Sequence, residues 1–418
     1  MTTIMASKKA LGLTAATAAL VLGLSACGNG DTGDGGDAAG EEFNLGVLYP
    51  QTGNLAFLGP PQIEAAEYAI EDINAAGGVL GTDVPAINEA DEAGDAGQAN
   101  EAANNLVADE VNAVVGAAAS GMTQAVYDTV TGAEIVQCSG SATSPELSGI
   151  DDGGYFYRTA PSDLMAGPVL AEQMVDDGHV SMSLIARADD YGAGYLDAVE
   201  SELEALGADV VSTDTFDPDA TNFDSVVNGA NDADADAVAL ISFEEGAQVI
   251  AELIEAGFDG DQLYVTDGLN DPDLGSTVSE DDPEVVTGMT GVAPGADNPE
   301  FNEGLREHAP DLDVFQFSPQ VYDCVTAVAL AAESAGSVEP ADYVEHLAEV
   351  SRPEGTECGS FEECRDLLDD GEDIDYQGAS GNIDFDDNGD PTAATFEVFH
   401  WDDDGHGTLD YVDYSAEE

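Results

Sequence analysis

The sequence has very few basic residues. Its 418 residues include 87 Asp and Glu but only 7 Lys and Arg, which gives a formal net charge of −80 at pH 7. Both lysines, Lys8 and Lys9, lie near the start, and every later basic residue is an arginine. No basic patch exists to neutralise phosphates, so nucleic-acid binding is excluded. The same shortage argues against docking on anionic lipid through a polybasic segment.

The shortage of basic residues is not accompanied by a shortage of apolar ones. Hydrophobic residues make up 43% of the chain and charged residues 22%, so this is not a disordered acidic tail. A folded surface this acidic repels itself unless counterions screen it. We therefore interpret the composition as halophile-type, suited to concentrated salt. The length corresponds to two or three domain-sized units.

Long apolar runs are also missing, apart from one near the start. Residues 11–24 form an apolar stretch of about fourteen residues behind Lys8-Lys9, too short for a comfortable membrane span and typical of a signal peptide. The sequence LSAC then places small residues before Cys27, which resembles the lipobox of bacterial lipoproteins. We expect residues 1–26 to be a signal peptide, and residues 27–42 to be a lipidated cysteine with a flexible Gly-rich tether. The protein would then be exported and anchored to the outer face of the cell membrane; an ordinary secretory signal with a chance cysteine is the alternative.

Only four cysteines follow Cys27. Export makes disulfides possible, and Cys358 and Cys364 are close together and flanked by polar residues, so we expect them to bridge a local loop. Cys138 lies in an apolar run and Cys324 in a helical one, so both are expected to be buried thiols. No spacing resembles a zinc site. We expect no metal and no cofactor.

Catalytic motifs are scarce as well. None of the five histidines lies in a metal-binding helix motif, and there is neither a G-x-S-x-G elbow nor a phosphate loop. Residues 384–389 partly match a calcium loop, but its twelfth position is Thr395 and not Glu, so we interpret it as a turn. The sequence therefore does not predict an enzyme.

What the sequence does contain is an alternation of short strands with amphipathic helices. The run 43–49 is a predicted strand, and the helix after Pro60 ends at Gly77-Gly78. This alternation predicts parallel sheets with helices on both faces, which bind ligands at the carboxyl ends of their strands. Near the end, residues 376–385 and 394–401 are predicted strands of a hairpin around the turn 387–390. Further strands are predicted at 113–115, 134–138, 182–185, 210–213, 237–241 and 263–266, with helices at 123–130, 193–206 and 246–256.

The loops that follow these strands contain the candidate chemistry. Asp163 and Asp267 lie in otherwise neutral, hydroxyl-rich loops, where a buried carboxylate is costly unless a cation such as a ligand ammonium accompanies it. Ser120, Ser141 and Thr143 offer hydroxyls that, with backbone N–H groups and a helix N-terminus, would hold a ligand carboxylate. Each Ser or Thr alone fits a helix cap equally well. The combination fits an α-amino acid zwitterion.

Several stretches of the sequence, in order, carry a family resemblance. They are LGVLYPQTGNLAFLGPPQIEAAEYAIEDINAAGGVLG, GAAASGMTQAVYDTV, CSGSATSPELS, YRTAPSDLMAGP, ADDYGAGY, YVTDGLND, YQGASGNIDFDDNGDP and FEVFHW. Through them the chain resembles the substrate-binding proteins of branched-chain amino acid ABC transporters, the leucine/isoleucine/valine-binding family, over nearly all of its length from Phe43. The resemblance implies an α/β, type I periplasmic-binding-protein fold, with two doubly wound parallel-sheet lobes, three crossovers and a ligand between the lobes. The expected lobes are residues 43–162 plus 290–390, and residues 163–289 plus 391–418.

Ligand contacts carry over from the family by motif. Three hydroxyl residues would hold the α-carboxylate, two acids would face the ammonium, and Tyr191 would close over the ligand from the second lobe. Leu58 and Phe243 would contact the ligand side chain, and Leu58 replaces an aromatic residue, which leaves the side-chain specificity open. No residue is assigned a catalytic role. The hydroxyl residues are Ser120, Ser141 and Thr143, and the acids are Asp163 and Asp267.

The resemblance implies capture by hinge closure. The protein is expected to act as a monomer that binds an amino acid, with a branched-chain one as the first candidate, and to deliver it to an ABC permease and its ATPase. A ligand-binding sensor subunit is one alternative, and the binding of a short-chain amide or urea-like solute is another.

Overall fold

The computed structural model describes residues 42–53, 55–312 and 314–415. The predicted signal peptide, the lipidation site Cys27 and all of the predicted tether except its last residue lie outside these residues. Within them, no helix combines the length and the apolar character that crossing a membrane requires.

The first sheet has five parallel strands in the order β2-β1-β3-β4-β5. Strands β1, β3, β4 and β5 are buried along their whole length, as expected of parallel strands covered on both faces. Helices α1 (Gly59–Ala75) and α10 (Ser318–Ala335) pack in one core of this sheet, and α2 (Ala96–Ala108) and α3 (Ser120–Thr131) pack in the other. The strands are β1 (Leu45–Tyr49), β2 (Asn88–Asp91), β3 (Ala113–Gly116), β4 (Val136–Ser139) and β5 (Phe156–Arg158).

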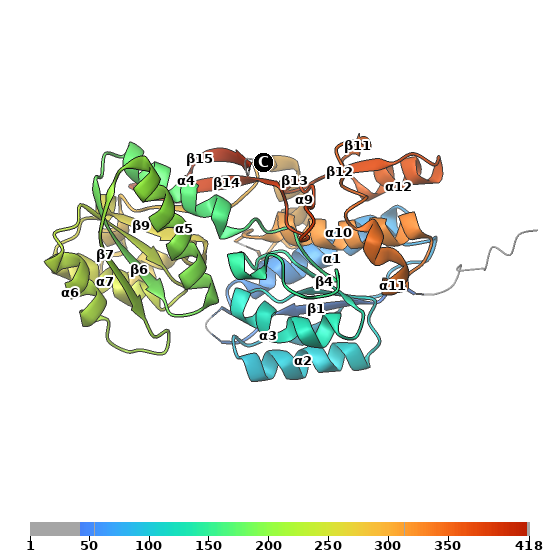
Figure 1. The fold of residues 1–418 in the computed structure, drawn as a ribbon, viewed down its shortest axis with the longest axis horizontal. Coiled ribbons are helices and arrows are strands. Elements are labelled where there is room, and N and C mark those ends of the chain that lie inside the picture. The colour runs from blue at the N-terminus through green and yellow to red at the C-terminus, as the bar shows by residue number, and fades with distance from the viewer. Residues whose placement is uncertain (1–41, 54, 313, 416–418) are drawn as a thin grey trace, which may run out of the picture. The chain divides into compact units, whose positions relative to one another are not determined.

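The second sheet has seven strands in the order β15-β14-β10-β9-β8-β6-β7. The strands from β7 to β10 are parallel, as expected, whereas β14 and β15 are antiparallel. Helices α4 (Asp163–Asp176) and α5 (Asp190–Leu206) pack in one core of the sheet, and α6 (Asp224–Asp232) and α7 (Gly246–Ala256) in the other (Figure 1). The strands are β6 (Ser181–Arg187), β7 (Asp209–Phe216), β8 (Ala237–Ile241), β9 (Leu263–Thr266), β10 (Thr290–Pro294), β14 (Ala393–Asp402) and β15 (Gly405–Ser415).

The chain passes between the two lobes three times, as the resemblance implies. It leaves the first lobe after β5, returns between β10 and α9 (Pro299–His308), and crosses again before β14. The expected lobe boundary at residues 289 and 290 is wrong, because β10 pairs with β9 inside the second sheet. The return to the first lobe therefore comes after Pro294.

The predicted C-terminal hairpin is also wrong in its partners. Strand β12 (Ile374–Gly378) pairs with β11 (Thr356–Cys358) and β13 (Gly381–Asn382) in a small third sheet, whereas β14 pairs with β10 and β15. The predicted turn itself is present, closed by a bridge between Phe385 and Pro391. It separates two sheets instead of two strands of one hairpin. The remaining short helices are α8 (Leu274–Val278), α11 (Pro340–Tyr343) and α12 (Phe361–Asp369).

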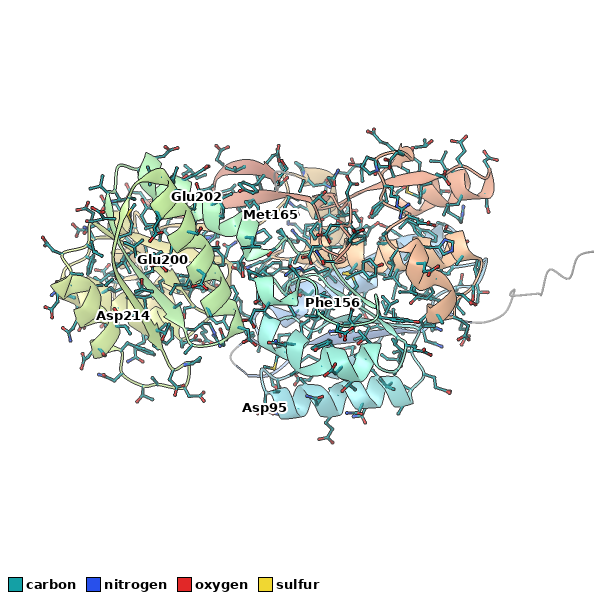
Figure 2. The ribbon with its side chains drawn as sticks, in the orientation of Figure 1. Asp95, Phe156, Met165, Glu200, Glu202 and Asp214 are labelled. Atoms are coloured by element: carbon teal, nitrogen blue, oxygen red, sulfur yellow. A yellow bond between two sulfur atoms is a disulfide. The ribbon has the colours of Figure 1, made fainter. Side chains whose placement is uncertain are left out.

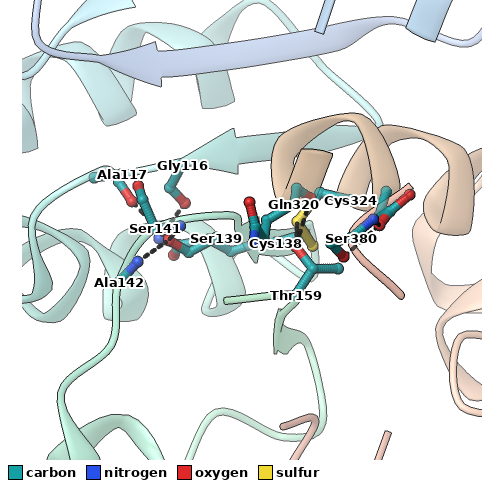
Figure 3. The surroundings of a disulfide bond; sticks show 12 residues. Gly116, Ala117, Cys138, Ser139, Ser141, Ala142, Thr159, Gln320, Cys324 and Ser380 are labelled. Carbon is teal, nitrogen blue, oxygen red and sulfur yellow. Dashed lines mark hydrogen bonds between the residues drawn. A yellow bond between two sulfur atoms is a disulfide. The ribbon is translucent and has the colours of Figure 1, made fainter. Parts of the chain in front are cut away.

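Two disulfides are present among the described residues. Cys358 and Cys364 are bonded to each other, as expected, and link β11 to α12. The expectation of buried thiols at Cys138 and Cys324 is wrong, because these two residues form a second disulfide between β4 and α10 (Figure 3). A sequence separation of 186 residues concealed the pairing. This bond joins α10 to the strand that leads directly into the loop containing Ser141 and Thr143.

The charge excess lies on the outside. Acidic side chains project from the ribbon over both lobes (Figure 2), and Asp95 accepts a hydrogen bond from the Gln98 N–H to cap α2. The Arg158 guanidinium, by contrast, is fully buried and pairs with Asp390 at 2.6 Å. It also donates to the carbonyls of Ala142 and Ser144, and so fastens the loop after β4 to β5.

Candidate functional site

The predicted ligand-contact residues lie at the carboxyl ends of the strands, in the loops there or in the first turns of the helices that follow. Leu58 follows β1, and the others follow β3, β4 and β5 of the first sheet or β6, β8 and β9 of the second. None has more than 7% of its surface exposed. The structure thus places all of them at the sheet edge that parallel strands offer to a ligand.

Asp163 is a fully buried carboxylate without a hydrogen-bond partner. It is the first residue of α4, next to the N-cap Ser162, and its N–H donates to the Thr143 carbonyl at 2.8 Å. Neither of its carboxylate oxygens accepts a hydrogen bond from the described residues. Burial, and after it the negative charge of Asp267, raise the pKa of the Asp163 carboxyl well above its usual range, while the Thr143 hydroxyl, which lies nearby but outside full hydrogen-bond geometry, and the charge of Arg158 oppose the shift.

Asp267 is held more firmly, from both lobes. The Tyr191 hydroxyl donates to its Oδ1 at 2.7 Å, and the Gln316 Nε2 donates to its backbone carbonyl at 2.6 Å. Burial raises the pKa of Asp267 to about 6, against the lowering effect of the Tyr191 hydrogen bond. Gln316 precedes α10 of the first lobe, so this contact links the two lobes beside the carboxylate.

The two carboxylates are therefore close enough to affect each other, and no salt bridge among the described residues joins either of them to a Lys or Arg. The Arg158 charge, which lowers the pKa of Asp163, is already engaged by Asp390 through two hydrogen bonds. Two buried carboxylates near each other favour either a shared proton or a bound positive group. A ligand ammonium meets this requirement.

In the second lobe, two stacked aromatic rings form one wall of the candidate ligand site. The rings of Tyr191 and Phe243 are stacked, with centroids 4.9 Å apart and planes 14° apart. The Arg187 guanidinium carbon lies 3.8 Å from the Phe243 ring centroid, and because Tyr191 occupies one face of that ring, Arg187 must lie on the other. Arg187 is itself anchored by Asp189 and Glu245, at 2.6 Å each. The stack fixes the orientation of the Tyr191 hydroxyl toward Asp267.

Apolar side chains of the first lobe meet this wall. Leu58, which precedes α1, belongs to the same buried cluster as Tyr191 and Phe243. The sequence argument missed two further first-lobe members of this cluster, Leu55 and Phe317. Phe317 has the left-handed backbone angle φ of 60° and is only 1% exposed, and no local sequence signal marks such a conformation in an aromatic residue.

The three hydroxyl residues are placed together but are not equally available. The Ser120 oxygen accepts from the Ser144 N–H at 3.1 Å, which leaves its own proton free to donate. The Ser141 hydroxyl donates to Gln62 Oε1 at 2.6 Å, so this side chain is already engaged by α1. Thr143 lies beside Asp163, with its carbonyl engaged by the Asp163 N–H.

A buried glutamate behind these hydroxyls was also missed. Glu92 accepts hydrogen bonds from the N–H groups of Ala118, at 2.8 Å, and Ala119, at 3.4 Å, just before Ser120. Burial raises its pKa to about 8. It braces the loop that presents Ser120. With 87 acidic residues in the chain, nothing in the sequence distinguishes Glu92 from the surface acids.

Comparison with known proteins identifies the family. The family model described as "Periplasmic binding protein" matches residues 42–406. The chain belongs to the periplasmic binding protein family. The resemblance that the motifs suggested is confirmed.

This binding protein is similar to curated relatives along most of its length. It is 26% identical over 374 residues to "Leu/Ile/Val-binding protein homolog 3" of Brucella melitensis, covering 88% of this chain and 93% of that one. It is 29% identical over 359 residues to "Chemotactic signal transduction system substrate-binding protein BasB" of Halobacterium salinarum, covering 83% and 84%.

Solved structures of the type I fold superpose on the binding protein. The substrate-binding protein LivJ of a branched-chain amino acid transporter from Streptococcus pneumoniae, solved with isoleucine, gives a TM-score of 0.73. That match covers 90% of this chain and 100% of LivJ at 20% identity, which establishes the fold. The predicted type I fold is therefore confirmed, with the antiparallel β14 and β15 as additions to the expected parallel sheet.

Proposed function

We propose that the protein captures an amino acid between its lobes, a branched-chain one as the first candidate, and delivers it to an ABC permease and its ATPase. The observation that carries this proposal is the pair Asp163 and Asp267, two buried carboxylates of which one lies where the chain crosses from β5 into α4 and the other follows β9, and no salt bridge among the described residues joins a Lys or Arg to either. A binding protein for a zwitterion needs such a pair, and it needs no catalytic group.

The capture follows from the lobe geometry. The ligand carboxylate would meet the first lobe at Ser120 and Thr143 and at the N–H groups of their loops. Closure would then bring Tyr191 and Asp267 of the second lobe to the ammonium. Water exclusion strengthens the attraction between the ammonium and the carboxylates, and these added contacts are what drive closure.

The apolar wall supports an aliphatic ligand side chain. Leu58, Phe243 and Phe317 lie in one buried cluster, and an apolar side chain loses nothing by transfer into such surroundings, whereas a charged one pays a large desolvation cost. The named relatives agree, since one is a Leu/Ile/Val-binding protein homologue and LivJ was solved with isoleucine.

Titration calorimetry with a matched ligand set tests the proposal. Leucine, isoleucine and valine should bind, whereas 4-methyl-2-oxopentanoate, which keeps the leucine carboxylate and side chain but lacks the ammonium, should not. Lysine and glutamate test the apolar wall, and acetamide and urea test the amide alternative. Equal affinity for leucine and its oxo analogue would refute the role of the two aspartates.

One observation favours the alternative that the protein is a sensor subunit. The relative from Halobacterium salinarum is named as a substrate-binding protein of a chemotactic signal transduction system. Cross-linking the amino-acid-loaded protein to membranes of its source organism, followed by mass spectrometry, separates the two roles. Recovery of a permease supports transport, and recovery of a signalling receptor supports sensing.

We also propose that Cys27 carries the lipid that holds the exported protein at the outer face of the membrane. The LSAC sequence supports this assignment. Cys27→Ser should release the protein into the medium, and membrane retention of this variant would rule the anchor out. A single chromatographic species of monomer mass is expected for the released form.

A further inference from the structure

Outside the cleft, three metal-ligating side chains of the first lobe converge on one point. Glu64 and Glu67 of α1 and His308 at the end of α9 each offer one ligand atom, and these atoms all lie within 4.8 Å of one another. Sequence spacing did not predict a metal site, because the histidine and the carboxylates are more than 240 residues apart. Only the packing of α9 against α1 brings them together.

The histidine is oriented for coordination. Its Nδ1 lies 2.7 Å from Glu71 Oε2, and since an ionised carboxylate only accepts hydrogen bonds, Nδ1 carries the proton. In the tautomer with the proton on Nδ1, the lone pair lies on Nε2, which is 3.6 Å from Glu64 Oε2. A carboxylate that accepts from the non-ligating nitrogen is the usual second-shell partner of a metal-binding histidine.

The separation of His308 and Glu64 fits a shared ion better than a direct bond. At 3.6 Å the Nε2 and Oε2 atoms are beyond ordinary hydrogen-bond range. Ligands at about 2.1 Å from a tetrahedral zinc ion are roughly 3.4 Å apart. The His308 side chain is 17% exposed, and its ring centroid lies 5.6 Å from that of Tyr68, which limits the rotation of the imidazole.

The carboxylates on this face are short of positive charge. Glu64, Glu67 and Glu71 occupy one face of α1 at helical spacing. No salt bridge within the described part of the chain joins a Lys or Arg to any of these three acids.

We propose that Glu64, Glu67 and His308 form a binding site for a divalent transition-metal ion such as Zn²⁺, with Glu71 as the orienting partner of the histidine. One imidazole and two carboxylates are a donor set suited to zinc and its neighbours, whereas Mg²⁺ and Ca²⁺ prefer oxygen alone. The ion joins α1 to α9 within the first lobe. This site would have a different role from the proposed ligand site, and the proposal does not depend on the proposed function.

Calorimetry on chelator-treated protein in buffer with excess Mg²⁺ tests the site, because Mg²⁺ occupies the nonspecific acidic surface. Wild type should bind one Zn²⁺ per chain, and Zn²⁺ should raise its unfolding temperature. His308→Gln should abolish both effects, and Glu71→Gln should weaken binding about 10- to 100-fold. His346→Gln is the matched control, because His346 also faces a carboxylate, Glu349, at 3.6 Å, and no second carboxylate pairs with it among the residues that the structure describes.

Two outcomes would overturn the site. Wild type without a Zn²⁺ site above the Mg²⁺ background would show that His308 is only an ion-paired imidazolium. Unchanged Zn²⁺ affinity in His308→Gln would place the metal elsewhere. Should His308→Gln fail to fold, as judged by near-ultraviolet circular dichroism, Glu67→Gln gives the same test. Amino acid binding should be unchanged in all these variants.

Discussion

Replacing Asp163 by Asn should weaken ligand binding and, without ligand, stabilise the protein. The Asp163 carboxylate is fully buried and accepts no hydrogen bond from the described residues. Truncating one partner of a buried charge pair costs about 2–5 kcal/mol, which is roughly 30-fold to a few thousand-fold in Kd at about 1.4 kcal/mol per tenfold change. The unliganded variant should gain about 1–3 kcal/mol of unfolding free energy, because a neutral amide is less costly to bury without partners than a carboxylate.

The sign of the pH dependence provides a second check. Because the folded-state pKa of Asp163 is raised above its usual value of 3.8, the folded protein binds its proton more tightly than the unfolded chain does. The carboxyl therefore supports stability at low pH, and this contribution is lost as the pH rises through the folded-state pKa. The gain in unfolding free energy of Asp163→Asn over wild type, measured without ligand, should be small near pH 4 and should grow toward neutral pH.

The matched control is Asp323→Asn. Asp323 is also a fully buried aspartate, but it accepts hydrogen bonds from the Tyr376 hydroxyl at 2.8 Å and from the N–H groups of Ala379 at 2.7 Å and Ser380 at 2.8 Å. An amide would turn a donor toward these donors, so this variant should lose about 3 kcal/mol of stability or more and keep wild-type amino acid affinity.

Chemical denaturation monitored by tryptophan fluorescence, with and without leucine, measures both variants, and calorimetry measures affinity. The two aspartates should give opposite signs in stability and unequal effects in affinity. If Asp163→Asn destabilises the unliganded protein as Asp323→Asn does and binds leucine normally, Asp163 is a structural residue and the ammonium site is wrong.

Three further results are expected. Tyr191→Phe removes the hydrogen bond to Asp267 and should therefore raise the pKa of that carboxyl further. Leucine affinity at pH 7 should fall about tenfold, with only a small change in the free energy of unfolding. Calorimetry at pH 7 and pH 8.5 should show that part of the lost affinity is recovered at the higher pH, and equal losses of affinity at the two pH values would contradict the reasoning. In the wild-type protein, a ligand ammonium requires Asp163 and Asp267 to be ionised, so ligand binding should release protons near pH 6 and the affinity should rise with pH. Calorimetry in buffers of different ionisation enthalpy measures the number of protons released. Proton uptake on binding would contradict the assignment of the two aspartates. Replacing Cys138 and Cys324 by Ser should lower the free energy of unfolding by about 5 kcal/mol, because the disulfide closes a loop with a sequence separation of 186 residues in the unfolded chain. Urea unfolding measures this decrease. A decrease below about 1 kcal/mol would show that burial alone already fixes the pair.

The regular elements were the most predictable part of the fold. The helix at 193–206 was predicted from apolar periodicity and a terminal Gly207, and α5 runs from Asp190 to Leu206 with Gly207 in the left-handed conformation. Such signals are local, since each depends on residues within a few positions of one another. The same is true of the buried parallel strands, which appear as short apolar runs.

Pairings across the sequence were not predictable. The alternating pattern of residues 394–401 marks a strand but does not say which strand lies beside it, and β14 pairs with β10 about a hundred residues earlier. The partner of Cys138 was concealed in the same way. Both are set by how the two lobes exchange segments, which is a property of the whole chain.

The site was predicted in its residue types more fully than in its geometry. The strand-end loops and the family motifs selected two aspartates that the structure buries within reach of each other's charge, but the sequence could not show that the Ser141 hydroxyl is engaged by Gln62 or that Gln316 reaches the Asp267 carbonyl. Those contacts depend on side-chain directions that become defined only when the lobes are packed.

For this protein, the position of a carboxylate matters more than the number of carboxylates. A net charge of −80 acts mainly at the surface, where salt screens each acid from its neighbours within roughly 10 Å at 0.1 M and 3 Å at 1 M. Asp163 and Asp267 are at most 4% exposed, so their attraction for a bound ammonium would be screened far less. The acidic surface would then depend on salt while the proposed ligand site remained largely independent of it. Without this separation, the cations that screen the acidic surface would also neutralise the two carboxylates that we propose to bind the ligand.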